Sequence, residues 1–183
     1  MLPSGRENMA RNVEIKARVE SIDSILPKVA ALADRGPILI IQDDTFFACE
    51  SGRLKLRAFS DDAGELIFYR RENRKGPKES FYLVAPTECP GILREALLQA
   101  YGQAGRIRKK RILYLKDRTR IHLDRVEDLG DFLELEVVLA EGEKSENGQA
   151  VAREIMAALD IQPDQLIEGA YIDLLAADNH LNG

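Results

Sequence analysis

The sequence predicts an α+β protein in which about eight antiparallel strands form one sheet or barrel, with helices packed outside. In segment 12–19 every even-numbered residue is polar or charged and every odd-numbered residue is apolar, and the alternation returns in 53–57, 120–124 and 133–137. A strand sends successive side chains to opposite faces, so several strands present charge to one side. Each half of the chain also has a helix after or between its strands, which favours α+β over a βαβ fold.

The strands are bounded by turn-forming residues. Asp61-Asp62-Ala63-Gly64 is expected to join a hairpin, and the segment 127–130 forms another turn. Strands are expected near 12–19, 40–48, 52–59, 64–72, 78–85, 106–115, 118–124 and 131–140.

The helices are expected between and after these strands. Ser21 or Asp23 can cap a first helix, which ends at Gly36 before Pro37. Thr87 is expected to cap a second helix that runs to about residue 101. The remaining helices are a third opening at 145 and a short one after 163 that leads into 170–175.

Composition is that of one soluble domain, with 183 residues, 45% hydrophobic and 31% charged. We expect a disordered leader over 1–8, a single domain over 9–176 and a polar tail over 177–183. No apolar run reaches the roughly 18 residues of a membrane span, and no secretory signal is present. We therefore expect a cytoplasmic protein that contacts no membrane, with Cys49 and Cys89 as free thiols.

The charge distribution points to small anions as ligands. The net charge of −5 argues against a nucleic-acid polymer as partner, because such proteins usually carry a basic surplus. The basic residues crowd into predicted strands and into 106–111. An acidic protein with concentrated basic strands suits a small, highly charged anion.

Common catalytic motifs are absent from the sequence. There is no GxxxxGK[ST], GxGxxG, GxSxG or HExxH, and only two histidines, His122 and His180, are present. What remains is carboxylate and cation on facing strands. Glu14, Glu134 and Glu136 supply oxygen ligands suited to Mg²⁺ or Mn²⁺.

Cations on the predicted strands complete the requirements for holding a polyphosphate, because arginine binds phosphate oxygens bidentately. They are Lys16, Arg18, Arg53, Lys55, Arg57, Lys109, Arg111 and Arg120.

A simpler interpretation competes at each point. The charges of 12–19 alone fit the solvated face of an antiparallel strand with cross-strand ion pairs, and only the further strands of the same kind favour a lined cavity. Arg106 and Lys110 are interpreted as a solvated edge, unlike Lys109 and Arg111. His122 is interpreted as a hydrogen-bonding strand residue rather than a general base.

The residues also resemble a known family. Asn12-Val13-Glu14-Ile15-Lys16 resembles the N-terminal ExExK motif of the CYTH superfamily, the triphosphate tunnel metalloenzymes, and the resemblance covers about residues 9–175. Further matching motifs are Gln42-x-Asp44-Thr45-Phe46-Phe47, Gly52-Arg53-Leu54-Lys55-Leu56-Arg57, Leu66-Ile67-Phe68-Tyr69-x-Arg71, Lys78-x-Ser80-x-Tyr82, Lys109-x-Arg111, Thr119-Arg120-Ile121-His122-Leu123-Asp124 and Phe132-Leu133-Glu134-Leu135-Glu136.

The resemblance implies an eight-stranded antiparallel tunnel that binds a triphosphate with basic side chains and Mg²⁺ or Mn²⁺ with acidic ones. It adds Arg71 and Lys78 to the cations expected to bind substrate, and Asp124 to the metal set of Glu14, Glu134 and Glu136. The residues expected to carry catalysis are Glu14, Lys16, Arg57 and Arg120.

The sequence departs from the family motif at one position. Asn12 stands where ExExK has its first glutamate, and an amide is a neutral ligand that cannot act as a base. With the run 120–124, this change resembles the bacterial class IV adenylate cyclase-like subgroup.

Three hypotheses about function follow. The first is a metal-dependent enzyme, monomeric or homodimeric, that acts on ATP, tripolyphosphate or thiamine triphosphate, either as a cyclase producing cyclic AMP and pyrophosphate or as a hydrolase. The second is a polyphosphate-binding or nucleotide-binding module whose catalysis is lost through Asn12. The third is a barrel with a merely solvated charged face.

Overall fold

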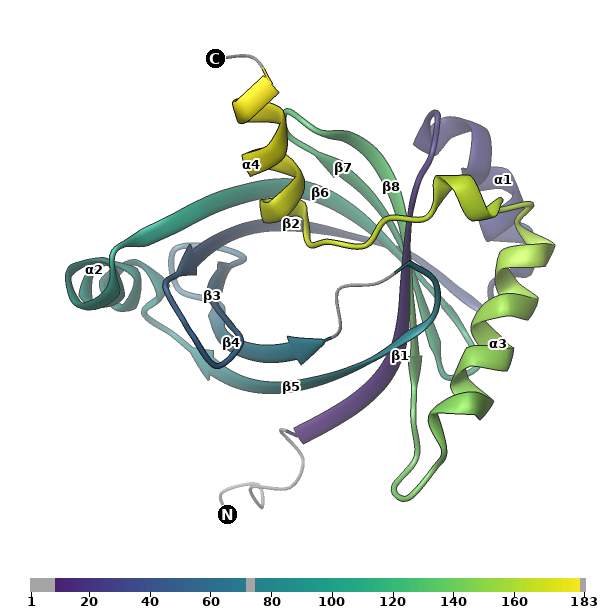
Figure 1. Ribbon diagram of the computed structural model, residues 1–183, viewed down its shortest axis with the longest axis horizontal. Coiled ribbons are helices and arrows are strands. Elements are labelled where there is room, and N and C mark those ends of the chain that lie inside the picture. Colours follow the sequence, from purple (N-terminus) through teal and green to yellow (C-terminus); the bar gives the residue numbers. More distant parts are fainter. Residues whose placement is uncertain (1–8, 72–74, 182–183) are drawn as a thin grey trace.

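Eight antiparallel strands close in a ring in the computed structural model, which describes residues 9–71 and 75–181. The strand order around the ring is β1-β5-β4-β3-β2-β6-β7-β8, and β8 pairs back onto β1 (Figure 1). The predicted α+β class and eight-stranded antiparallel sheet are therefore confirmed. The strands are β1 Met9–Arg18, β2 Arg35–Phe47, β3 Arg53–Ala58, β4 Gly64–Arg71, β5 Lys78–Thr87, β6 Gln103–Lys116, β7 Thr119–Val126 and β8 Gly130–Val138.

Helices lie outside the ring, as predicted (Figure 1). They are α1 Ile22–Leu32, α2 Pro90–Tyr101, α3 Ser145–Ala158 and α4 Tyr171–Leu181, with a single 3₁₀ turn at Pro163–Gln165. Helix α1 contacts β6 and β7, α3 contacts β1 and β8, and α2 contacts β2 and β3. Helix α4 contacts β6 and covers most of the segment 177–183, whereas residues 1–8 lie outside the described part of the chain.

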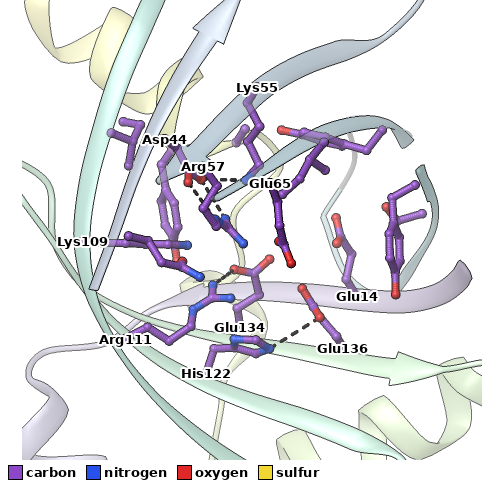
Figure 2. A pocket seen from close by; sticks show the side chains of 18 of the residues that line it. Glu14, Asp44, Lys55, Arg57, Glu65, Lys109, Arg111, His122, Glu134 and Glu136 are labelled. Carbon is purple, nitrogen blue, oxygen red and sulfur yellow. Dashed lines mark hydrogen bonds and ion pairs between the residues drawn. The ribbon is translucent and has the colours of Figure 1, made fainter. Parts of the chain in front are cut away.

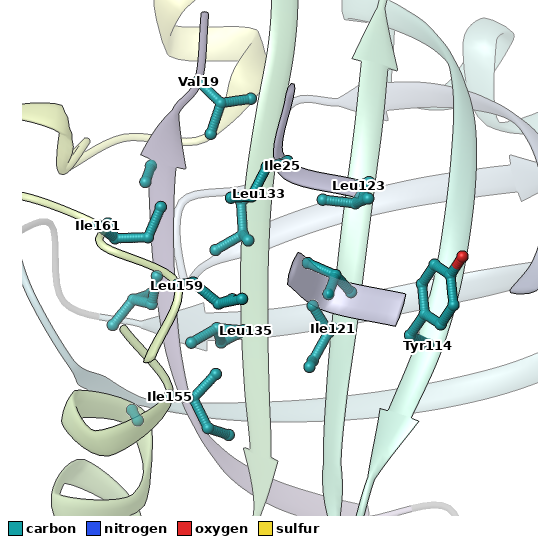
Figure 3. Close-up of a cluster of buried hydrophobic side chains, with 14 of the residues drawn as sticks. Val19, Ile25, Tyr114, Ile121, Leu123, Leu133, Leu135, Ile155, Leu159 and Ile161 are labelled. Atoms are coloured by element: carbon teal, nitrogen blue, oxygen red, sulfur yellow. The ribbon is translucent and has the colours of Figure 1, made fainter. Parts of the chain in front are cut away.

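The main hydrophobic core lies between the outer face of the sheet and helices α1 and α3 (Figure 3). Apolar odd-numbered residues of β1, β7 and β8, such as Ile15, Ile121 and Leu135, are at most 1% exposed and belong to one cluster with Val29 of α1 and Ile155 of α3. Fully burying each such side chain contributes about 1.5–3 kcal/mol. Because the apolar face of these strands points outward to the helices, their polar face must point into the ring.

The start of β2 differs from the prediction. Helix α1 ends at Leu32 rather than Gly36, because the Asp34 N–H already donates to the Leu115 carbonyl and joins the chain to β6. Gly36 then lies within β2 at φ 125°, followed by a cis bond to Pro37. Tertiary pairing with β6 therefore determines this boundary.

The start of α2 also differs. The helix begins at Pro90 with Cys89 as its N-cap. Thr87 Oγ1 accepts a hydrogen bond from the Cys89 N–H at 3.2 Å, so Thr87 supports the turn before the helix and is not its cap.

Cys49 and Cys89 are both free thiols. Within the described residues, no helix has the length and apolar character needed to cross a membrane.

Packing of α3 on the sheet depends on Gly148. A Cβ at this position would lie 2.7 Å from Leu139 Cδ2 and 2.8 Å from Val13 Cγ2. Gly148→Ala should therefore lower the free energy of unfolding by about 1–3 kcal/mol through overpacking. Gly91→Ala in α2 is the matched control, because its Cβ would meet no atom within 4 Å. Urea denaturation should show this control to be neutral or slightly stabilised; equal destabilisation of both variants would contradict the argument.

Candidate active site

The ring encloses a cavity of about 390 Å³. Every strand contributes alternate residues to its wall. Tyr171, the first residue of α4, and Ala170, the residue before it, also line the cavity. The charged lining residues are Glu14, Lys16, Asp44, Lys55, Arg57, Glu65, Lys109, Arg111, Arg120, Glu134 and Glu136. The charged strand face of the sequence is thus the wall of a cavity.

Three carboxylates gather on one side of this cavity. Glu14 of β1 lies opposite Glu136 of β8 in the strand register, and Glu134 is two residues away on the same face. One ligand oxygen from each of the three lies within 4.8 Å of the others (Figure 2). Although burial opposes ionisation, the charges of Lys16 and Arg111 lower the pKa of Glu134 to about 2. Three carboxylates at this spacing fit a hard divalent cation.

Cations face this cluster in two pairs, each held by a buried aspartate. Asp44 of β2 accepts two hydrogen bonds from Arg57, both of 2.7 Å, and one of 2.7 Å from Lys55. Despite the cost of burial, these cations keep the pKa of Asp44 far below its usual range. Burial, followed by repulsion from Arg57, lowers the pKa of Lys55 to about 7.

Asp124 of β7 holds the second pair in the same way. It accepts from Arg111 Nε at 2.6 Å, Arg111 Nη2 at 2.7 Å and Lys109 Nζ at 3.0 Å. The Tyr171 hydroxyl donates to it at 2.9 Å, and Lys16 Nζ lies 3.7 Å from the centre of the Tyr171 ring. Tyr171 therefore attaches the start of α4 to the wall of the cavity.

Ion pairs connect the cations to the carboxylate cluster. Arg111 Nη2 also donates to Glu134 Oε2 at 3.0 Å, and Arg120 Nε donates to Glu136 Oε2 at 2.7 Å. The cavity can therefore hold an anion with its cations while its carboxylates hold a metal ion.

Three buried side chains of the wall have polar atoms without hydrogen-bond partners within the described structure. One is Gln42, which is 3% exposed and whose Oε1 accepts no hydrogen bond. Asn12 is 2% exposed and its Oδ1 accepts no hydrogen bond, and His122 is 4% exposed with neither ring nitrogen hydrogen-bonded. His122 Nε2 lies 3.5 Å from Glu136 Oε2. Burial, followed by repulsion from Arg111, lowers the pKa of His122, so its imidazole is neutral at pH 7.

Comparison with known proteins places this cavity in a family. The model of the CYTH domain matches residues 10–171, which is most of the chain. The chain belongs to the CYTH family. Enzymes of this family act on triphosphates in a metal-dependent tunnel, which agrees with a cavity of buried cations and carboxylates.

Several known proteins are similar to nearly the whole chain. A candidate adenylate cyclase of Methanocaldococcus jannaschii is 26% identical over 174 residues, which are 88% of this chain and 97% of that protein. A solved structure from Pyrococcus horikoshii has a TM-score of 0.79 at 22% identity and covers 89% of this chain and 98% of its own. A Hippeastrum candidate adenylyl cyclase with a dominant triphosphatase activity has a TM-score of 0.66 at 15% identity, covering 91% and 96%. These structures share the fold.

The CYTH cavity contains most of the residues predicted from the sequence. They are Glu14, Lys16, Lys55, Arg57, Lys109, Arg111, Arg120, Glu134 and Glu136. Four others lie on the expected face of their strands but outside the cavity wall: Arg18, Arg53, Lys78 and Asp124. The side chain of Arg71, the last residue of β4, lies outside the described residues.

Each of these four has a local partner. Arg18 donates to the Leu129 carbonyl at 2.8 Å, and Arg53 makes a bidentate pair with Asp173 of α4. Lys78 is fully buried and donates to the Glu168 carbonyl at 2.7 Å. Asp124 binds cations and Tyr171 instead of joining the three glutamates.

Asp44 and Tyr171 organise the cations of the CYTH site but were given no role from the sequence. Asp44 shares the inward face of β2 with Gln42 and Phe46, so strand alternation marks it as a cavity residue. Tyr171 could not be found this way, because its position depends on how α4 packs against strands distant in sequence.

Proposed function

We propose that this CYTH protein is a metal-dependent hydrolase of a small triphosphate. The observation that carries the proposal is the arrangement of Lys55, Arg57, Lys109 and Arg111 on two aspartate supports, in one cavity with three carboxylates. Four cations at fixed positions suit the several negative oxygens of a triphosphate. The dominant triphosphatase activity of the Hippeastrum relative supports the same reaction class.

Glu14, Glu134 and Glu136 would hold the divalent ion, Mg²⁺ or Mn²⁺, which neutralises charge on the phosphate oxygens. The protein's cations orient the triphosphate and stabilise charge on the departing diphosphate. Water forms a bond to the terminal phosphorus, and the bond from that phosphorus to the bridging oxygen breaks. The electron pair stays with diphosphate, and phosphate and one proton are released.

A cyclase reaction is the second candidate. The cavity wall also contains Ile40, Ile67, Val84 and Tyr82, which provide an apolar surface for a nucleoside, and the Methanocaldococcus jannaschii relative is a candidate adenylate cyclase. In this reaction the 3′ hydroxyl of ATP attacks its own α-phosphorus, and pyrophosphate leaves.

Incubation with ATP, thiamine triphosphate and tripolyphosphate, each with Mg²⁺ or Mn²⁺, separates the candidates. Phosphate release is expected from at least one substrate, and cyclic AMP with pyrophosphate would instead identify the cyclase. Thermal stabilisation by tripolyphosphate without turnover would identify a binding module, for which Asn12→Glu tests whether the missing carboxylate restores activity. If tripolyphosphate is neither turned over nor stabilises the protein, the remaining hypothesis is a barrel with a merely solvated charged face.

Lys55 gives anion binding a specific pH dependence. In the protein without ligand the pKa of Lys55 is about 7, so this side chain becomes neutral as the pH rises above 7. A bound triphosphate favours the charged ammonium form. Binding above pH 7 therefore takes up a proton. As the pH rises, this effect weakens the affinity for triphosphate by up to about tenfold per pH unit, until the pH reaches the pKa of Lys55 in the complex.

Lys55→Arg is the matched variant, because arginine stays charged throughout this range. Calorimetric titration of metal-free protein with tripolyphosphate between pH 7 and 9 should show a smaller proton uptake for the variant than for the unmodified protein. Since the ligand's own ionisation is common to both, identical pH profiles would contradict the role of Lys55.

A further inference from the structure

Tyr171 brings the start of α4 into the cavity, and the proposed reaction gives it no role. The side chain is 5% exposed. Its hydroxyl donates to Asp124 at 2.9 Å, and its ring packs against Phe132 with the two ring centres 4.9 Å apart. Burial, together with the negative charge of Asp124, raises the pKa of Tyr171 well above its usual range, so the phenol stays neutral and remains a donor.

Two lysines of the cavity wall lie against this ring. Lys16 Nζ is 3.7 Å from the ring centre and Lys109 Nζ is 4.9 Å from it, both within the roughly 6 Å of a cation–π contact. Both lysines are buried, and the attraction between a cation and an aromatic face is stronger when the cation is desolvated. The ring therefore helps to fix two ammonium groups that are carried on flexible side chains.

An aromatic ring supports a cation of an anion site differently from a carboxylate. A carboxylate cancels the charge of the cation that it holds, and it repels a phosphate oxygen that approaches the same place. The electron-rich face of a neutral ring attracts an ammonium through its quadrupole and adds no net charge. The ring of Tyr171 can therefore orient Lys16 and Lys109 while the cavity keeps its attraction for an anion.

Contacts on either side of Tyr171 hold the ring in place. Asp173, two residues later, accepts hydrogen bonds of 2.8 Å and 2.7 Å from the guanidinium of Arg53 on β3. The carbonyl of Glu168, three residues earlier, accepts from Lys78 of β5 at 2.7 Å. The position of the ring is thus determined by three strands, because its own hydroxyl is bound on β7.

We propose that Tyr171 is a positioning residue for the triphosphate, whose ring holds Lys16 and Lys109 ready for the phosphate oxygens without neutralising them. The inference rests on the anion-binding role that the proposed function gives to these lysines. It concerns binding of the anion and can be tested without turnover.

Calorimetric titration of the metal-free full chain with tripolyphosphate tests this role. Tyr171→Phe keeps the ring and should bind within about threefold of the unmodified protein, whereas Tyr171→Leu loses the ring and should bind about tenfold more weakly. Ile172→Ala is the matched control, because Ile172 packs α4 against the cluster around Phe132 and is not a lining residue of the cavity. This control should loosen α4 and leave the affinity unchanged.

Proton NMR of the metal-free protein gives a readout that packing of α4 alone does not move. Lys16 Nζ lies over the ring, so the ring current should shift the ε-methylene protons of Lys16 upfield in the unmodified chain and in Tyr171→Phe. The upfield shift should vanish in Tyr171→Leu and persist in Ile172→Ala.

Equal affinities of Tyr171→Phe and Tyr171→Leu would overturn the proposal, and so would equal weakening by Ile172→Ala and Tyr171→Leu. Unshifted Lys16 protons in the unmodified chain would also overturn it, whether or not the leucine variant folds. Weaker binding confined to Tyr171→Leu, without turnover of any triphosphate by the unmodified chain, would contradict the proposed hydrolase and leave the role of Tyr171 standing.

Discussion

Replacement of Glu14 by Gln is expected to lower the turnover of tripolyphosphate at least about 100-fold, which is the scale of losing one preorganised electrostatic group in an active site. Glu14 is buried and is one of the three glutamates whose carboxylate oxygens lie within 4.8 Å of one another. The amide has nearly the same shape but no charge, so the site loses attraction for a divalent ion while the cations that bind phosphate remain. Phosphate release under saturating Mn²⁺ measures the effect.

Glu79→Gln is the control for this experiment. Glu79 is on the neighbouring strand β5 but on the outer face of the sheet, where it pairs with Arg11 at 2.7 Å. The same chemical change there should leave turnover nearly unaltered. Metal-free binding of tripolyphosphate should be at least as tight in Glu14→Gln as in the unmodified chain, because a negative charge has left the cavity. Equal turnover of the two variants would show that Glu14 has no role in the reaction.

Strand periodicity predicted which face each residue occupies, and this accounts for most of the site. Lys55 and Arg57 on β3, and Glu134 and Glu136 on β8, point inward as their alternation with leucines indicated. The same rule gives no position along the axis of the ring. Arg53 therefore shares the inward face of β3 but reaches α4, where it binds Asp173.

Partners were harder to predict than faces, because they depend on register between strands. Asp124 carries the charge of a metal ligand, but β7 lies beside β6, and Arg111 is its direct register partner. Two hydrogen bonds from one guanidinium then occupy the carboxylate. The same principle applies to Asp44 and Arg57 across β2 and β3. A sequence without pairing information cannot distinguish a carboxylate that supports cations from one that binds a metal.

Replacement of Asp124 by Asn is expected to lower the free energy of unfolding by about 3–5 kcal/mol, as found when one partner of a buried ion pair is removed. Asp124 is fully buried and accepts from Arg111, Lys109 and Tyr171. Asparagine removes the charge and turns an NH₂ group toward these donors. Asp43→Asn is the control, since Asp43 pairs with the half-exposed Arg106 near the surface, where the loss should be at most about 1 kcal/mol.

The pH dependence of the free energy of unfolding tests the contribution of Asp124 a second time. Arg111 and Lys109 overcome the cost of burial and hold the pKa of Asp124 well below its usual range. Its contribution to stability is therefore complete above the unfolded pKa of about 3.9 and is lost as the pH falls toward the folded value. Urea denaturation between pH 2.5 and 6 should show a shallower acid slope for Asp124→Asn than for Asp43→Asn.

Tripolyphosphate should stabilise Asp124→Asn more than it stabilises the unmodified chain, because Lys109 and Arg111 then face the cavity without their carboxylate. Equal stabilisation of the two proteins would mean that these cations do not bind the anion.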